Sequence, residues 1–273
     1  MADNDIIQTP VFMDMADWRL IIYIESGRLQ AYLKSTVNKE MPIRLACDSS
    51  WEVKEPADQL RGLETTVYDR PSLLDDYEAD IIIDTSSTIF VPSAAVEEPG
   101  DAEILYSTFY DAPDVDIFID RLGTECCLYS PAPRMKPFIE RTFPGARIAS
   151  TLTILIDKMR TMSTGKRIYA HLNEKIAIVI AFDGEQLLCA ASHPASDAAE
   201  AAYHIVHARA VYGLTDSSTR VWLSGNEAML KDVENILITA GIENAITPMP
   251  SFAGAILPLA AAFCANRPIK RKP

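Results

Sequence analysis

Glycine and cysteine are both scarce in this sequence. Eleven glycines are spread over 273 residues, and the glycine-dependent motifs of phosphate-loop proteins and serine hydrolases, G-x-x-x-x-G-K-[ST] and G-x-S-x-G, are missing. "MSTGK" (residues 162–166) resembles a phosphate loop only faintly, because it lacks the leading glycine and does not precede a predicted helix. No two cysteines are spaced as C-x-x-C, which excludes common zinc and redox motifs. We therefore interpret the cysteines as small buried hydrophobic residues in a reducing compartment and predict a cytoplasmic location; they are Cys47, Cys126, Cys127, Cys189 and Cys264.

Long apolar runs are missing too. No stretch reaches the roughly 18 residues that a membrane helix needs, and the most apolar segment, residues 252–265, contains Pro258 and predicts a buried helix. The first residues, "MADNDIIQTP", are acidic and lack the basic start of a signal peptide. We therefore expect neither a membrane span nor a signal peptide.

Positive charge is in short supply. The net charge is −13 and the isoelectric point about 4.8, so the surface repels phosphate backbones and we expect no nucleic-acid partner. The exception is the end of the chain, "RPIKRKP", which we interpret as a solvated basic tail.

The first half of the chain predicts a sheet with helices. Residues 19–25 and 28–34 are rich in strand formers and flank Ser26-Gly27, which indicates a hairpin. "PIRLACD" follows as a third strand, residues 56–77 read as helical with a break at Arg70-Pro71, and "ADIIIDTSS" is typical of a strand buried on both faces. A segment at 87–131 then predicts a helix near 98–106 and a hairpin of "DVDIFID" and "ECCLYSP". Helices at 134–142 and 151–162 flank the strand "ARIAS".

The same order of elements starts again at residue 167. Strands at 167–172, 175–182 and 186–192 are followed by a helix at 197–212, the strand "TRVWLSG", a helix at 227–240 that Gly241 ends, and the strand "AITPMP". We predict a flexible N-terminal arm (1–17), a first lobe (18–163) with an insertion near 87–131, a second lobe (164–250), and a C-terminal helix with a basic tail (251–273). The order of elements alone indicates that the two lobes are similar.

Three stretches of this plan resemble the signatures of actin-like ATPases. "IIYIESGRLQAYL" resembles the first phosphate hairpin of that superfamily, "YAHLNEKIAIVI" its second, and "VWLSGNEAMLKDV" its adenosine motif. The whole chain is similar to a bacterial family of unknown function with an actin-like ATPase fold, and the segment 87–131 resembles the altered subdomain of pilus-assembly and cell-division members. The resemblance covers residues 17–265. It implies an α/β fold with mixed sheets, ribonuclease H-like, in two lobes.

The resemblance also implies where a nucleotide would bind. ATP hydrolysis in such a fold needs a carboxylate on each hairpin and bare backbone N–H groups for the phosphates. In the first hairpin Glu25 replaces the usual aspartate, and Arg28 follows Ser26 and Gly27 where a small hydroxyl residue is usual.

The second and third signatures depart further. His171 takes the position of the second aspartate and Asn173 that of a glycine, while Glu174 and Lys175 fill what should be a tight phosphate turn. A glutamate there would repel a triphosphate. The third stretch, Ser224-Gly225-Asn226, keeps a single glycine, so side chains occupy space that the adenosine would need. If a nucleotide binds at all, we expect these turns to hold it; otherwise we expect no cofactor and no catalytic residue.

Two smaller patterns suggest metal sites. His204 and His207 are three apart on a predicted helix, with His193 as a possible third ligand, but a zinc site needs three or four convergent ligands. Asp114 and Asp116 alternate with apolar residues, which favours a strand with one wet face over a calcium loop. We expect no metal.

The favoured hypothesis is therefore a non-catalytic interaction or scaffold protein on a degenerate actin-like fold, which binds a protein partner or itself. The alternative is a nucleotide-binding protein or slow ATPase that uses ATP and Mg²⁺ in the cleft between the lobes, with Glu25 in the role of the aspartate. A third reading is an unrelated small-molecule enzyme in the same cleft.

Overall fold

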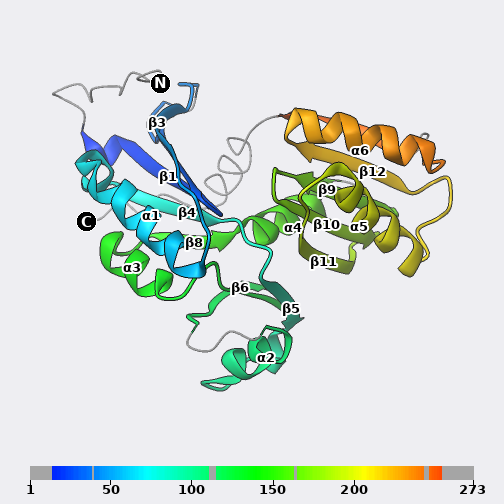
Figure 1. Cartoon of the computed structure of the whole chain (residues 1–273), viewed down its shortest axis with the longest axis horizontal. Helices are drawn as coiled ribbons and strands as arrows, with labels where there is room; N and C mark the ends of the chain where they lie inside the picture. Colours follow the sequence, from blue (N-terminus) through cyan, green and yellow to red (C-terminus); the bar gives the residue numbers. More distant parts are fainter. Residues whose placement is uncertain (1–13, 39, 111–114, 163–164, 243–245, 254–273) are drawn as a thin grey trace. The chain divides into compact units, whose positions relative to one another are not determined.

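The computed structural model describes residues 14–38, 40–110, 115–162, 165–242 and 246–253 (Figure 1). The strands in this part of the chain form two five-stranded sheets and one three-stranded sheet. No helix within the described ranges has both the length and the apolar character that crossing a bilayer requires.

The first sheet has the strand order β3-β2-β1-β4-β8. Its strands are β1 (Trp18–Glu25), β2 (Arg28–Ser35), β3 (Arg44–Ser50), β4 (Glu78–Ile83) and β8 (Arg147–Ser150). The first three are antiparallel neighbours, whereas β4 runs parallel to β1 and β8 parallel to β4. Residues Leu20 to Ile24 are at most 2% exposed, as a continuous apolar run in a central strand requires.

Two helices accompany this sheet, α1 (Pro56–Tyr68) and α3 (Met135–Thr142). Their side chains meet where the rings of Tyr68 and Phe138 make an edge-to-face contact with centroids 6.1 Å apart. Helix α1 starts with a proline and a capping box between Glu55 and Asp58. The break predicted before Pro71 is confirmed: α1 ends at Tyr68 and a short 3-10 helix, η2 (Pro71–Leu74), follows. Another 3-10 turn, η1 (Met15–Asp17), precedes β1.

The second sheet repeats the first one's topology, with the order β11-β10-β9-β12-β13. Its strands are β9 (Arg167–Leu172), β10 (Ile176–Asp183), β11 (Gln186–Pro194), β12 (Arg220–Gly225) and β13 (Ile246–Ala253). Again three antiparallel strands come first, and two parallel ones follow. The two halves of the sequence, which have the same order of elements, therefore also form sheets with the same strand order.

Helices α5 (Ala198–Val211) and α6 (Glu227–Thr239) lie side by side and pack on the second sheet (Figure 1). The core between these helices and the sheet contains alternate residues of the strands, such as Ile168, Ala170 and Leu172 of β9. Ile205 of α5 and Val233 of α6 belong to the same core. Helix α4 (Thr151–Met162) follows β8 and contacts β11.

The inserted segment forms the small sheet, ordered β5-β7-β6. It consists of β5 (Thr88–Pro92), η3 (Ser93–Ala95), α2 (Asp101–Phe109), β6 (Phe118–Leu122) and β7 (Glu125–Tyr129). The predicted hairpin is present as β6 and β7. The strand expected to start near Asp114 is wrong at its beginning: Asp114 lies outside the described residues, and residues 115–117 are not in a strand.

The chain divides into two compact units. One comprises Met1–Asp84, Asp111–Phe118 and Ser130–Ser150, and the other comprises Thr85–Tyr110, Ile119–Tyr129 and Thr151–Pro273. Most of the inserted segment thus groups with the second sheet, and the lobe boundaries drawn from the sequence stay a prediction. Strand β13 runs to Ala253, two residues into the predicted C-terminal helix. The rest of that helix, the basic tail and residues 1–13 of the arm lie outside the described residues.

Candidate functional site

The first candidate turn is the two-residue link between β1 and β2. Glu25 pairs with Arg28 across the hairpin, and Ser26 and Gly27 form the turn. Gly27 has φ = 78°, a left-handed conformation that side chains disfavour. The geometry of the turn alone therefore requires this glycine.

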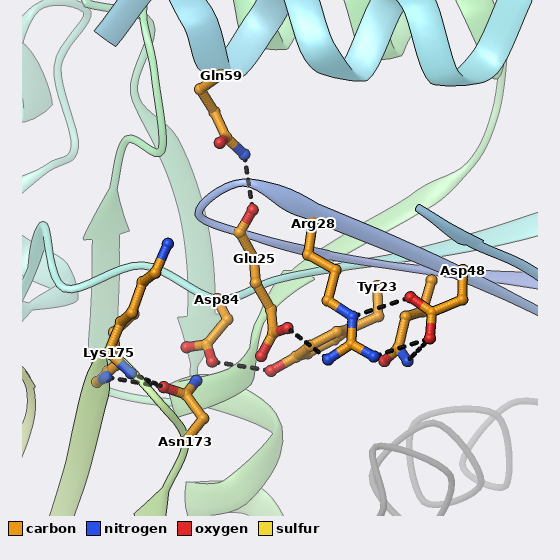
Figure 2. A network of polar contacts seen from close by, with 10 residues as sticks. Tyr23, Glu25, Arg28, Asp48, Gln59, Asp84, Asn173 and Lys175 are labelled. Carbon is orange, nitrogen blue, oxygen red and sulfur yellow. Dashed lines mark hydrogen bonds and ion pairs between the residues drawn. The ribbon is translucent and has the colours of Figure 1, made fainter. Parts of the chain in front are cut away.

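The amide of Gln59 closes this turn. The backbone N–H of Gly27 donates to Gln59 Oε1 at 2.8 Å. Gln59 Nε2 donates to the carbonyl oxygen of Glu25, also at 2.8 Å (Figure 2). Gln59 is a buried residue of α1, only 5% exposed. The carbonyl of Gly27 in turn accepts from the Trp51 N–H at 2.8 Å. The Gly27 N–H is thus bound within the protein and is not a bare donor.

The charges beside the turn are also compensated locally. Arg28 donates two hydrogen bonds to the carboxylate of Asp48, at 2.9 and 2.8 Å, and its Nη1 lies 4.0 Å from Glu25 Oε2 (Figure 2). Gln30 Nε2 donates to the same Asp48 carboxylate at 2.9 Å. The hydrogen bonds from Arg28 hold the pKa of Asp48 below its ordinary value. Arg28, where the resemblance implies a small hydroxyl residue, therefore links the two acids of its own sheet.

Asp84 is a site residue that the sequence analysis missed. It directly follows β4, whose Ile83 pairs with Ile24 of β1, so Asp84 and Glu25 come at the carboxyl ends of two neighbouring parallel strands. Asp84 is 3% exposed, and its Oδ2 accepts a hydrogen bond of 2.8 Å from the hydroxyl of Tyr23 (Figure 2). Ligands of open α/β sheets bind at this edge. The signal was the acid that ends the buried run "ADIIID".

The second candidate turn, residues 173–175, is closed by its own asparagine. Asn173 Oδ1 accepts from the backbone N–H of Lys175 at 3.0 Å and from that of Ile176 at 2.7 Å (Figure 2 shows the former). The N–H of Asn173 donates to the carbonyl of Ile176 at 3.0 Å. An asparagine side chain that binds the following N–H groups is a standard turn, and here it occupies two of the donors that a phosphate would need. Glu174 is exposed.

His171 lies inside the second sheet. It is 5% exposed, and its Nδ1 lies 2.9 Å from the hydroxyl of Ser224 on the neighbouring strand β12. The hydroxyl of Tyr169 contacts the same Ser224 oxygen. Burial lowers the pKa of His171 to about 4, so the ring is neutral at pH 7. The ring at the position of the second aspartate thus joins β9 to β12 and does not reach the protein surface.

The third candidate stretch also serves the fold. Ser224 is fully buried in the contact with Tyr169 and His171. A Cβ on Gly225 would meet the carbonyl oxygen of Leu172 at 1.8 Å, so the close approach of β9 excludes any side chain there. Asn226 caps α6: its Oδ1 accepts from the N–H groups of Ala228 and Met229 at 3.0 and 3.2 Å.

Two of the histidines that we considered as metal ligands, and for which we expected no metal, lie in contact. The rings of His193 on β11 and His204 on α5 stack with centroids 3.9 Å apart, and Tyr203 stacks on His207 at 5.6 Å. Parallel stacked imidazoles face each other instead of a shared ion. In the part of the chain that the structure describes, no group of three or more His, Cys, Asp or Glu side chains could hold a metal. The absence of a metal remains a prediction.

A separate groove lies along α1 in the first unit. Its volume is about 340 Å³, and it is lined by residues of the β3 end and of α1, among them Ser49, Trp51, Gly62 and Thr66. None of the turn residues predicted from the sequence lines it.

Comparisons with known proteins agree with the fold. The family model described as "Protein of unknown function (DUF3822)" matches residues 15–238. A crystal structure of a Bacteroides thetaiotaomicron protein, described as having an actin-like ATPase fold and unknown function, superposes with a TM-score of 0.80 at 16% identity and covers 94% of this chain and 100% of that one.

A chain of the "PilM-PilN type IV pilus biogenesis complex" superposes with a TM-score of 0.53 at 12% identity, covering 92% of this chain and 99% of that one. No functionally curated protein matches the sequence. At these identities the similarity establishes the actin-like ATPase fold, and the expected fold class is confirmed.

Proposed function

The chain belongs to the DUF3822 family of proteins of unknown function, and we propose that it is a non-catalytic interaction protein, a scaffold on an actin-like ATPase fold without ATP hydrolysis. Its partners are other proteins or a second copy of itself. No cofactor is part of this function.

The observation that carries the proposal is the internal use of the turn donors. Gln59 binds the N–H of Gly27, and Asn173 binds the N–H groups of Lys175 and Ile176. Phosphoryl transfer depends on backbone donors and metal ligands that are positioned and open toward the phosphates. A triphosphate would have to displace these bonds and would lose affinity for each donor left unpaired.

The kinship in fold supports a role in protein assembly. One structure with this fold belongs to a complex of two proteins in type IV pilus biogenesis. In the same way, we propose that this chain contributes a binding surface to an assembly.

We place this function in a reducing compartment, the cytoplasm. Cys47, Cys126 and Cys127 are buried free thiols, and Cys189 is a half-buried one. They serve as small apolar side chains.

A second candidate function has one observation in its favour. Glu25 is the last residue of β1 and Asp84 directly follows the adjacent parallel strand β4, and two carboxylates at such an edge are a donor set that suits Mg²⁺. In this alternative the protein binds ATP with Mg²⁺ or hydrolyses it slowly.

Release of inorganic phosphate separates the first candidate from the hydrolytic form of the second. The purified protein, at micromolar concentration, is incubated with Mg-ATP for hours. We expect it to release phosphate no faster than its Glu25→Ala and Asp84→Ala variants. Turnover that both substitutions abolish, in proteins that keep the wild-type circular dichroism spectrum, would establish the ATPase instead.

A further inference from the structure

The groove beside α1 runs along most of the helix. Its helical wall consists of residues of α1 and its C-cap at spacings of three or four, which are Asp58, Arg61, Gly62, Thr65, Thr66 and Asp69. That spacing keeps them on one face of the helix. The axial rise from Asp58 to Asp69 is about 16 Å. The groove is therefore long enough for four or five residues of an extended chain, at about 3.3 Å per residue.

The opposite wall is the end of an edge strand. Ser49 and Ser50 of β3, followed by Trp51 and Glu52, line this side of the groove. β3 is the outermost strand in the order β3-β2-β1-β4-β8. Within the described ranges, the backbone of residues 44–50 bonds to no strand other than β2. In an edge strand, every second residue points its N–H and C=O groups outward, away from the sheet.

The strand is regular where it borders the groove. A bulge shifts the register between β2 and β3, because Ala31 pairs with Cys47 whereas the next residue, Tyr32, pairs with Leu45. Bulges protect an edge against pairing at the place where they occur. This bulge precedes the groove, and residues 47–50 pair with β2 without interruption. The last four residues of β3 can therefore accept another strand.

The hydrogen-bonding groups of this edge select the kind of occupant. N–H and C=O groups that alternate along a strand are matched in spacing by another extended backbone, which is how peptides add to the edge of a sheet. A small molecule would satisfy only one or two of these groups. The helix beside the edge then contacts the side chains of the added strand, which gives the interaction its specificity.

Arg70 determines which charge the occupant carries. It lines the groove and is half-buried. Burial raises the pKa of Cys47, and the positive charge of Arg70 opposes that shift, so the guanidinium lies near the middle of β3. Arg61, the other arginine of the wall, is paired with Asp58 at 3.1 Å, whereas no described residue forms an ion pair with Arg70. A guanidinium binds a carboxylate through two parallel hydrogen bonds.

The acids of the wall leave room for such a carboxylate. Besides its ion pair, Asp58 accepts hydrogen bonds from the N–H groups of Lys54 and Glu55 at 3.0 and 3.1 Å. Glu52 is paired with Lys54 at 3.2 Å. Asp69 is exposed, so water and salt screen its charge. The positive charge of Arg70 is thus the one within the wall that an incoming group can still neutralise.

We propose that an extended segment of a partner protein adds to the edge of β3 and lies in the groove beside α1, with an aspartate or glutamate of the segment on Arg70. The proposal rests on the interaction role proposed above and names the chemistry of the partner. Four or five residues bury little area, so binding is weak, with a Kd on the order of 10–100 µM.

Selection from random peptides of about 12 residues displayed on phage, with the full chain as the target, tests the proposal. Synthetic copies of the enriched peptides are then titrated by fluorescence anisotropy. We expect the enriched peptides to share an aspartate or glutamate, and Arg70→Ala to weaken their binding at least tenfold. The matched control is Arg141→Ala, at an exposed arginine of α3 in the same unit, which should bind as the wild type does. Circular dichroism and melting curves show whether each variant is folded.

Methylation of the peptide backbone tests the added strand itself. Only every second N–H of an added strand bonds to its neighbour. N-methyl groups on one alternate set of residues should therefore abolish binding, and those on the other set should leave the Kd within about threefold.

Three results would overturn the proposal. They are a selection that enriches no peptide over an uncoated surface, enriched peptides that bind Arg70→Ala as tightly as the wild type, and binding that tolerates methylation at every position. In the second and third cases the chain still binds peptides, so the interaction role would stand while the groove beside α1 would not be the site. Release of phosphate from ATP is measured separately and decides the ATPase alternative by itself.

Discussion

At the scale of single residues, polar side chains at the candidate site satisfy the backbone of their own turns. Gln59 uses both ends of its amide on the first turn, and Asn173 uses its oxygen on the second. Buried backbone groups need such partners because an unpaired one costs about 1–3 kcal/mol. Gln59 and Asn173 thus stabilise the hairpins by binding N–H groups that a ligand would otherwise need.

Replacing Gln59 by leucine should destabilise the protein strongly. The N–H of Gly27 and the carbonyl of Glu25 would both lose a 2.8 Å hydrogen bond in a buried place, and we expect a loss of about 2–4 kcal/mol in the free energy of unfolding. Urea denaturation measures it. Gln59→Glu keeps only the acceptor for the Gly27 N–H, so its free energy of unfolding should lie between those of the wild type and Gln59→Leu. A loss below about 0.5 kcal/mol for Gln59→Leu would contradict the account.

His171 should make stability depend on acid. Burial lowers its folded pKa to about 4 from 6.5, so the unfolded chain binds more protons between these two values. The contribution is therefore complete above pH 6.5 and falls as the pH drops toward 4, by up to about 3 kcal/mol.

The comparison with His171→Asn isolates this effect, since other groups titrate in the same range and asparagine keeps a hydrogen-bonding side chain toward Ser224. Chemical denaturation at half-unit steps from pH 7 to pH 4 should give a shallower decline in the variant. Equal slopes in the two proteins would show that His171 takes up its proton without unfolding.

At the scale of elements, side chains that approach closely fix the path of α1 against the end of β3. Gly62 lies in the middle of α1, where glycine costs about 1 kcal/mol relative to alanine. The Trp51 ring explains it: a Cβ on Gly62 would lie 2.3 Å from Trp51 Cγ. The glycine thus gives up helix propensity so that the indole can lie against the helix backbone.

Gly62→Ala should therefore destabilise the protein by about 1–3 kcal/mol, although helix propensity alone predicts a gain. In a Trp51→Ala background the same substitution should become stabilising by about 0.5–1 kcal/mol. A double-mutant cycle from thermal or urea unfolding measures the coupling. Additive effects of the two substitutions would mean that the ring moves away at no cost.

The elements themselves could be read from the sequence. Apolar runs such as residues 19–25 and "ADIII", and a turn signal such as Ser26-Gly27, are local patterns, and the structure places strands and a turn there. The prediction that Asp116 lies in a strand is wrong. Alternation of polar and apolar residues over a few positions does not show whether a partner strand is present.

The site was less predictable because its contacts join distant residues. Gln59 meets Gly27 across 32 positions, and Asp84 meets Tyr23 across 61. No local pattern indicates that a glutamine within a helix binds a turn. The substitutions at 25, 171 and 224–226 were visible in the sequence, but the burial of His171 and Ser224 depends on the register between β9 and β12.

At the scale of the whole molecule, two sheets share one strand order, and in each of them a side chain binds backbone N–H groups of the hairpin turn. The order β3-β2-β1-β4-β8 matches β11-β10-β9-β12-β13. Each sheet holds a hairpin that is closed by a side chain of the same unit, Gln59 in one and Asn173 in the other.

The melting temperature with and without Mg-ATP tests the central claim most directly. A ligand bound with micromolar affinity and present at about 5 mM would stabilise the chain by several kcal/mol through mass action, enough to raise the Tm by several degrees. The account predicts no change in Tm beyond that caused by magnesium with inorganic phosphate. A rise of several degrees with Mg-ATP that disappears in Glu25→Ala would show that a nucleotide enters the site after all.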